Sequence, residues 1–180
     1  MQTDGQLRRP QLKKTLGMPG AKMREETRIE TCDPMDFVGV ALYGNPETTP
    51  FCSAWELLGA VADDAGISRI GKHIYGLQIY HPRFPKQFEL TYMACLQREP
   101  QMDVPIRMIV KSVPGSRYAV QKVDGGVTGI DQALVYLYRE YIPQNDLRVA
   151  MPIDFEKYGA VQNHESVPDD IEVWVPVEDA

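Results

Sequence analysis

The sequence predicts an α+β fold in which two β-α-β-β modules form one antiparallel sheet with two helices. The order strand, helix, strand, strand occurs twice, over about residues 27–98 and 104–178. Alternating apolar residues indicate the strands, and apolar residues at helical spacing indicate both helices. The 180 residues have an ordinary globular composition and suffice for one domain. Because a single module of about 75 residues would have a thin core, we expect the two modules to pack together.

The first module opens with a strand-like pattern over residues 28–43. Asp33-Pro34 interrupts this pattern, so we expect a bulge or turn there. A helix is predicted over residues 50–65, because Thr49-Pro50 offers a capping side chain followed by a proline at the first helical position. Gly66 predicts the end of this helix, since glycine accepts the left-handed conformation.

Two further strands complete the first module. Residues 73–80 are rich in β-branched and aromatic side chains, and Pro82 ends the strand. Residues 88–96 alternate, with Met93 on one face. The other face is formed by Phe88, Leu90, Tyr92, Ala94 and Leu96.

The second module repeats this order. Residues 105–122 predict a strand pair or one long bent strand, broken at Pro114-Gly115. A helix follows over residues 129–141, with Thr128 as its cap and Pro143 as its end.

Strands at residues 149–158 and 170–177 close the chain, with a polar loop at 162–169 between them. The two modules match faintly in sequence: residues 76–80 can be aligned with 152–156. A ligand cleft is expected between the two halves of such a fold.

The net charge of −6 is distributed unevenly along the chain. Residues 1–24 hold six basic residues and one acid, a balance of +5 that leaves −11 for the rest. An acidic body does not suit direct binding of nucleic acid, whose phosphates require a basic surface, but it suits a cationic or neutral ligand. Few apolar residues and several glycines and prolines predict a flexible basic leader at 1–26, ahead of a single domain at 27–180.

Several functional classes leave no pattern in the sequence. No apolar run reaches the roughly 18 to 20 residues that span a bilayer, and no secretory signal is present, so we expect a cytoplasmic protein that does not bind membranes. The three cysteines and three histidines show neither disulfide-framework nor metal-ligand spacing. No nucleophile elbow or phosphate-binding loop occurs. We expect no metal and no cofactor.

Glu156 is the first candidate for chemistry, because it lies inside an apolar strand. A carboxylate there needs a partner, a raised pKa or exposure to water. Alternation alone favours an outward-facing side chain, since Asp154 shares its parity. Aromatic residues are the second candidates, because their faces attract flat or cationic ligands, although most such residues pack cores. This set comprises Trp55, Tyr75, Tyr80, Tyr92, Phe155, Tyr158 and Trp174.

Five short segments together carry a likeness to a known family. They are GLQIYHP (76–82), TYMACL (91–96), SRYAVQKVDGGVTGIDQALVYLYREYIP (116–143), PIDFEKYG (152–159) and DIEVWVPV (170–177). Over about residues 27–178 the chain resembles the GyrI-like small-molecule-binding domains, which also occur as effector-binding domains of AraC-type and MerR-type multidrug regulators. The resemblance implies a tandem β-α-β-β fold with a ligand cleft between the halves.

The resemblance also implies roles for single residues. The family's P-x-F-E-x-Y motif places a glutamate in the cleft, and Glu156 stands at that position with Tyr158 two residues on. Trp174 stands where the family's last motif has an aromatic residue, and Tyr80 is the rough counterpart of Glu156 in the first half. The expected ligand site comprises Glu156, Tyr158, Tyr80, Trp174, Trp55, Tyr92, Met93 and Phe155. The first strand and the basic leader depart from the family pattern, and the leader is too short for a helix-turn-helix.

Three functions stay open at this point. The first is a stand-alone protein that binds amphipathic, aromatic, cationic compounds through Glu156. The second is a hydrolase of strained, cyclopropane-bearing natural products, because some stand-alone family members resemble such hydrolases. In this function Glu156 would be the general base, and Tyr158 or Tyr80 would orient or protonate the leaving group. The third is a protein-interaction module such as a gyrase inhibitor. The expected partner is a hydrophobic or cationic aromatic small molecule, and a homodimer or a separate regulator protein stays open.

Overall fold

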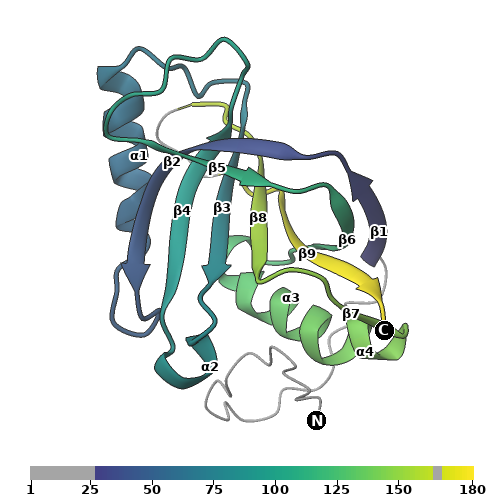
Figure 1. The fold of residues 1–180 in the computed structure, drawn as a ribbon. Coiled ribbons are helices and arrows are strands. Elements are labelled where there is room, and N and C mark those ends of the chain that lie inside the picture. The colour runs from purple at the N-terminus through teal and green to yellow at the C-terminus, as the bar shows by residue number, and fades with distance from the viewer. Residues whose placement is uncertain (1–26, 164–167) are drawn as a thin grey trace.

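A computed structural model describes residues 27–163 and 168–180. Within these residues nine strands form one sheet in the order β1-β6-β9-β8-β3-β4-β2-β5, with β7 beside β9. All of the paired strands run antiparallel. The α+β fold class is therefore confirmed (Figure 1). The predicted leader at 1–26, and residues 164–167 of the predicted loop, lie outside the described residues.

In the first half the predicted strands are present, and the helix begins later than predicted. Its elements are β1 (Thr27–Cys32), β2 (Met35–Gly44), α1 (Ser53–Asp64), β3 (His73–Tyr80), α2 (Phe84–Gln87) and β4 (Leu90–Gln97). The predicted start of α1 was wrong by three residues. The N–H groups of Thr48 and Thr49 bond the Asn45 carbonyl, so Thr49 belongs to a preceding turn, and the N-cap is Cys52 without a side-chain bond. The predicted end is confirmed, since Gly66 has φ +65°.

The short helix α2 was not predicted, and it shortens the strand that follows. Phe88 ends α2 in the left-handed conformation, with φ 54°, so it lies outside β4. The rest of the predicted alternation is confirmed. Leu90, Tyr92, Ala94 and Leu96 pack in one core cluster, while Met93 and Cys95 pack in another.

The second half contains a helix that runs past its predicted end. Its elements are β5 (Ile109–Val113), β6 (Ser116–Lys122), η1 (Gly126–Gly129), α3 (Ile130–Tyr136), the π-helical turn η2 (Leu137–Tyr141), α4 (Ile142–Gln144), β7 (Leu147–Val149), β8 (Ile153–Ala160) and β9 (Ile171–Asp179). Thr128 does not cap the helix: its hydroxyl donates to the Gly125 carbonyl within the 3-10 turn.

Pro143 does not end the helix, contrary to the prediction. A proline inside an α-helix clashes with the carbonyl four residues earlier and offers no N–H. The π-helical turn widens the helix just before Pro143, with the Ile142 N–H bonding the Leu137 carbonyl, and the chain continues helically to Gln144. The predicted strand at 149–158 was also too long, since residues 150–152 separate β7 from β8.

The two halves repeat the same pairing order. The first half pairs β3, β4 and β2, and the second pairs β8, β9 and β6, so the repeat predicted from the sequence is confirmed. The halves join at the centre of the sheet, where β3 pairs with β8. They also exchange strands: β1 pairs with β6, and β5 pairs with β2. Figure 1 shows β1 with β2, and β5 with β6, crossing between the two ends of the sheet. Asp33-Pro34 separates β1 from β2, and Pro114-Gly115 separates β5 from β6.

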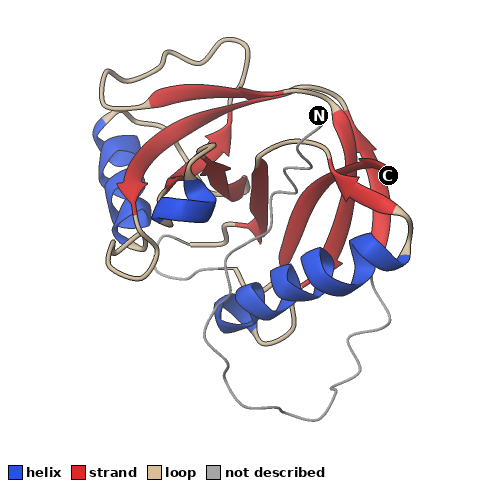
Figure 2. Cartoon of the chain, turned by 60° about the horizontal axis from the view of Figure 1, so that its bottom comes forward, coloured by secondary structure: helices blue, strands red, loops and turns tan. Residues whose placement is uncertain are grey.

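The sheet has two different faces. On the helix-covered face, α1 packs against β2 and β4, and α3 packs against β9 (Figure 2). The opposite face buries a second apolar cluster, which comprises Phe37, Tyr75, Leu77, Met93, Cys95, Val113, Tyr118, Val120, Ile153, Phe155 and Trp174. No helix in the described part of the chain is long and apolar enough to cross a membrane. The three cysteines are free thiols.

Candidate functional site

A cluster of polar side chains interrupts the apolar core on the helix-covered face. We call it the acid–phenol cluster; it comprises Trp55, Gln78, Tyr80, Tyr92, Tyr138, Asp154, Glu156 and Tyr158. Strands β3, β4 and β8 supply most of its members, while α1 supplies Trp55 and the π-helical turn supplies Tyr138. The cluster therefore draws on both halves of the fold.

Glu156 lies at the centre of the cluster with 6% of its surface exposed. Its Oε2 accepts hydrogen bonds from the hydroxyls of Tyr158, at 2.8 Å, and Tyr92, at 2.9 Å. Its Oε1 accepts one from the Gln78 amide at 3.1 Å. All three of these donors are neutral, so they solvate the carboxylate without neutralising its charge.

Burial controls the ionisation of Glu156. It raises the pKa of this carboxyl from 4.5 to about 7, against the opposing effect of the hydrogen bonds from Tyr158, Tyr92 and Gln78. The negative charge of Asp154 raises it further. Burial and the neighbouring Glu156 also raise the pKa values of the Tyr92 and Tyr158 hydroxyls, which therefore stay protonated as donors. A carboxyl with a pKa about 7 can change its charge near neutral pH.

Asp154 forms the second branch of the cluster. It is fully buried, and its Oδ2 accepts hydrogen bonds from the hydroxyls of Tyr138, at 2.7 Å, and Tyr80, at 2.8 Å. The Tyr80 hydroxyl also lies 3.1 Å from the Gln78 Oε1. Because the Tyr80 hydroxyl has a single proton, it donates either to Asp154 or to the Gln78 Oε1, and Gln78 and Tyr80 lie between the two carboxylates.

The strand register explains why donors face acids. Successive side chains of a strand point to opposite faces, so every second residue of β8, namely Asp154, Glu156 and Tyr158, lies on the helix-covered face. In the pairing of β3 with β8, Gly76 lies opposite Glu156 and Gln78 lies opposite Asp154. Side chains opposite one another or on the diagonal are within contact distance across an antiparallel pair. The meeting of the two halves at this register thus creates the cluster.

Aromatic rings line one side of Glu156. The Trp55 indole N–H donates to the Tyr92 hydroxyl at 3.1 Å, and its ring meets Tyr158 edge-on at 5.1 Å between centroids. Phe51 stacks on Tyr92 at 5.5 Å. Phe51 and Trp55 are only partly buried. The carboxylate therefore lies beside aromatic faces that retain some contact with solvent.

The structure brings together five of the eight residues expected at the ligand site: Glu156, Tyr158, Tyr80, Trp55 and Tyr92. Met93, Phe155 and Trp174 lie on the opposite face of the sheet, where Phe155 stacks on Trp174 at 5.5 Å. Sequence reasoning missed Gln78, Tyr138 and the role of Asp154. The parity of Asp154 with Glu156 and the polar Gln78 inside an apolar strand were the available signals.

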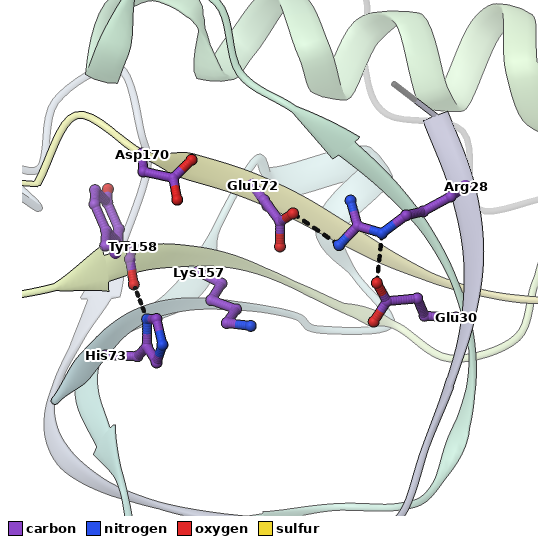
Figure 3. A pocket seen from close by; sticks show the side chains of 8 residues that line it. Arg28, Glu30, His73, Lys157, Tyr158, Asp170 and Glu172 are labelled. Carbon is purple, nitrogen blue, oxygen red and sulfur yellow. Dashed lines mark hydrogen bonds and ion pairs between the residues drawn. The ribbon is translucent and has the colours of Figure 1, made fainter. Parts of the chain in front are cut away.

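The opposite face carries a small open hollow of about 170 Å³ (Figure 3). Its charges largely face one another. Arg28 pairs with Glu30 and, at 2.7 Å, with Glu172. The Lys157 ammonium lies 5.3 Å from the centroid of the Trp174 ring. His73 donates from Nδ1 to the Tyr158 carbonyl at 2.8 Å. Among the described residues, no group of three or more His, Cys, Asp or Glu side chains is arranged to hold a metal ion.

Comparison with known proteins identifies a family. The family model described as the GyrI-like small molecule binding domain matches residues 25–178. No curated protein sequence gives a match.

Solved structures share the fold at low sequence identity. The structure of SAV2435 bound to tetraphenylphosphonium is 19% identical, with a TM-score of 0.65 over 86% of this chain and 94% of that one. The C-terminal domain of EcmrR is 12% identical, with a TM-score of 0.61 over 86% and 98%. A hydrolase encoded by lin2189 from Listeria innocua is 13% identical, with a TM-score of 0.51 over 85% and 92%.

Proposed function

Because the chain belongs to the GyrI-like small-molecule-binding family, we propose that it binds aromatic, lipophilic cations at the acid–phenol cluster. The ligand would lie between the two halves, against Trp55, Tyr92 and Tyr158, with its positive charge close to Glu156. One observation above all supports this function: within the described part of the chain, the buried Glu156 carboxylate accepts hydrogen bonds only from neutral groups.

The charge of Glu156 favours a cationic ligand. Among the described residues, no Lys, Arg or His forms an ion pair with Glu156, and the nearby Asp154 adds a second negative charge. An isolated buried carboxylate is costly, which is why its pKa rises. A bound cation would supply the missing counter-charge. Ionised Glu156 would then be more stable in the complex than in the free protein.

The surroundings favour a cation with a diffuse charge over a small ammonium ion. Three hydrogen bonds already occupy the Glu156 oxygens, so few acceptors remain for the N–H donors of an ammonium group. The aromatic rings of Phe51, Trp55 and Tyr92 offer apolar area and electron-rich faces instead. The related protein SAV2435 has been solved with tetraphenylphosphonium, which is a cation of this kind.

Tetraphenylphosphonium binding provides the test. We expect saturable binding by calorimetry at pH 8, and binding about 10- to 100-fold weaker in Glu156→Gln, because the amide keeps the shape and removes the charge. Glu47→Gln, which changes an exposed glutamate in the turn after β2, serves as the matched control. Neutral triphenylphosphine oxide should bind wild type and Glu156→Gln equally. Equal affinity of the two proteins for the cation would contradict the proposal.

The pH dependence of binding follows from the same group. The ionised carboxylate binds the cation, and the pKa of Glu156 in the free protein is about 7. Below that pH a growing fraction of the protein carries a neutral Glu156, so the affinity should fall from about pH 7 to about pH 5 toward that of Glu156→Gln. Glu156→Gln should show a flat profile over this range.

One observation also favours a second function, hydrolysis of a strained electrophilic ring. A carboxyl with a pKa about 7 suits a general base, and the Tyr158 and Tyr92 hydroxyls at 2.8 and 2.9 Å could protonate a leaving group. A related fold is that of a hydrolase from Listeria innocua. Chromatography of a cyclopropane-bearing alkylating compound incubated with the protein separates the two functions. Product formation that disappears in Glu156→Gln supports catalysis, while binding without turnover supports the sensor or sequestering role.

A further inference from the structure

Gly76 lies directly beneath the carboxylate of Glu156. The two residues are opposite one another in the pairing of β3 with β8. A Cβ atom placed on Gly76 would lie 2.3 Å from the Tyr92 hydroxyl oxygen and 2.5 Å from the Glu156 Oε2. Real Cβ atoms do not approach other atoms this closely. Both polar groups therefore occupy the space that a side chain at position 76 would take.

Ala94 on β4 is a second small residue beside Gly76. It is the pairing partner of Gly76 on the other side, is fully buried, and lies on the same face. The larger residues of β3 on that face, Ile74, Gln78 and Tyr80, stand on either side. The two small residues therefore lie side by side in one row across β4 and β3. The Tyr92 hydroxyl and the Glu156 carboxylate meet over Gly76, 2.9 Å apart.

We propose that Gly76 is a positioning residue for the cation site, whose missing side chain lets Glu156 and Tyr92 meet as a hydrogen-bonded pair against the backbone of β3. Gly76 contributes no polar group of its own. It acts through Glu156, whose depth in the sheet sets how far a cation must enter to reach its charge. The inference rests on the proposed function and adds a residue that limits which ligands reach the carboxylate.

The contacts of Gly76 separate this role from a purely structural one. The atoms closest to the added Cβ are the far ends of two flexible side chains. At Gly39 on β2, by contrast, an added Cβ would lie 2.1 Å from the Ala94 backbone oxygen. Gly76→Ala should therefore fold with the same sheet and displace Tyr92 and Glu156, whereas Gly39→Ala should disturb the backbone pairing of β2 with β4.

Two measurements on Gly76→Ala test the proposal. Tetraphenylphosphonium affinity at pH 8 should fall at least about tenfold, while far-UV circular dichroism and cooperative unfolding persist. Without ligand, the carboxyl ¹³C titration of Glu156 should move its midpoint by about one pH unit or more, because the displaced carboxylate changes both its burial and its hydrogen bonds. An unchanged midpoint together with unchanged affinity would overturn the proposal.

A matched control and a rescue complete the design. Gly159→Ala changes another strand glycine, on β8, where an added Cβ would lie 3.3 Å from its nearest neighbour, the Cβ atom of Asp170. It should leave both readouts unchanged. Glu156→Asp draws the carboxylate back by one methylene and so makes room for the methyl group that Gly76→Ala adds. The double variant Gly76→Ala/Glu156→Asp should therefore bind the cation more tightly than the sum of the affinity losses of the two single variants predicts. Additive losses would mean that the two residues do not share one space, and would count against the proposal.

The ligand-free titration distinguishes the failure of this inference from failure of the proposed function. If wild type does not bind tetraphenylphosphonium, the binding function fails, but the Gly76→Ala midpoint still reports on the positioning of Glu156. If wild type binds and Gly76→Ala matches it in both affinity and midpoint, only the role of Gly76 fails.

Discussion

The two central strands of the sheet are equivalent elements of the two halves, yet they contribute different chemistry to the same face. β8 presents two acids, Asp154 and Glu156. β3 presents no acid on that face, and instead offers the amide of Gln78, the hydroxyl of Tyr80 and, at Gly76, the space that the Glu156 carboxylate occupies. One half supplies the charge, and the other supplies donors and room for it.

This difference shows how a repeated fold can build a site that neither half contains. A buried acid needs hydrogen-bond donors, and those donors must be close enough to reach it. Strands that pair at the junction of two modules meet this requirement, because each residue of one strand faces a residue of the other. Divergence of the facing positions can then proceed independently, with acids on one strand and neutral partners on the other.

Removing the charge of Glu156 should have the largest effect on the difference between β8 and β3, and it is measured as the pH dependence of the free energy of unfolding. Its pKa is about 7 in the folded protein and 4.5 in the unfolded chain, so the folded state holds the proton more tightly. The resulting stabilisation is fully present below pH 4.5 and is lost as the pH rises through about 7, a change of roughly 3 kcal/mol in the free energy of unfolding. Glu156→Gln should lack this loss.

Urea unfolding of wild type and Glu156→Gln at pH 5 and pH 8 measures the effect as a difference in pH slope. The exposed variant Glu47→Gln should retain the wild-type slope, since its carboxylate is in contact with water. If Glu156→Gln also retained that slope, the buried carboxylate would not be the group that titrates.

A smaller effect should follow from removing the neutral partner on β3. Gln78→Leu deletes the amide that donates to Glu156 Oε1 and the carbonyl near the Tyr80 hydroxyl. We expect a loss of about 1–3 kcal/mol in the free energy of unfolding, larger at pH 8 than at pH 5 because the ionised carboxylate needs the donor more. Gln97→Leu, an exposed glutamine at the end of β4, is the control and should stay close to wild type. A loss that is equal at both pH values would mean that Gln78 only fills space.

Local patterns were sufficient to predict most of the architecture. β-Branched and aromatic residues predicted β3, and alternation predicted the faces of β4. Gly66 predicted the end of α1, and the order of elements predicted the repeat. Errors occurred where a neighbouring contact overrides a local signal. Thr49 is held by a turn with Asn45, and Pro143 is tolerated because the helix widens into a π-helical turn before it.

The candidate site was harder to predict because it depends on distant pairings. Alternation indicated that Asp154 and Glu156 share a face, but it could not say that this face is covered by helices. Tyr138 reaches Asp154 across the packing of a helix on the sheet, and Gln78 reaches Glu156 through the register of β3 with β8. Neither the packing nor the register is encoded in a local pattern. The motif resemblance indicated Glu156 and Tyr158, while their donors required the structure.

The smallest expected effect is the difference in stability between Tyr92→Phe and Tyr158→Phe, the two residues whose hydroxyls donate to the same oxygen of Glu156. Tyr92 comes from the first half and Tyr158 from the second, and their hydroxyls donate at nearly the same distance. Tyr92 alone also accepts the indole N–H of Trp55. Each Tyr→Phe change should cost about 1 kcal/mol in urea unfolding at pH 8, and Tyr92→Phe should exceed Tyr158→Phe by about 0.5 kcal/mol, because it removes two hydrogen bonds, one to Glu156 and one from Trp55.

The exposed pair of Tyr43 and Glu89 is the matched control for these two variants, since it has the same hydroxyl-to-carboxylate bond in contact with water. Tyr43→Phe should leave the free energy of unfolding close to that of wild type, because water replaces the lost bond. If Tyr158→Phe cost more than Tyr92→Phe, the link from α1 through Trp55 to Glu156 would contribute nothing. The second half would then hold its own acid without help from the helix of the first.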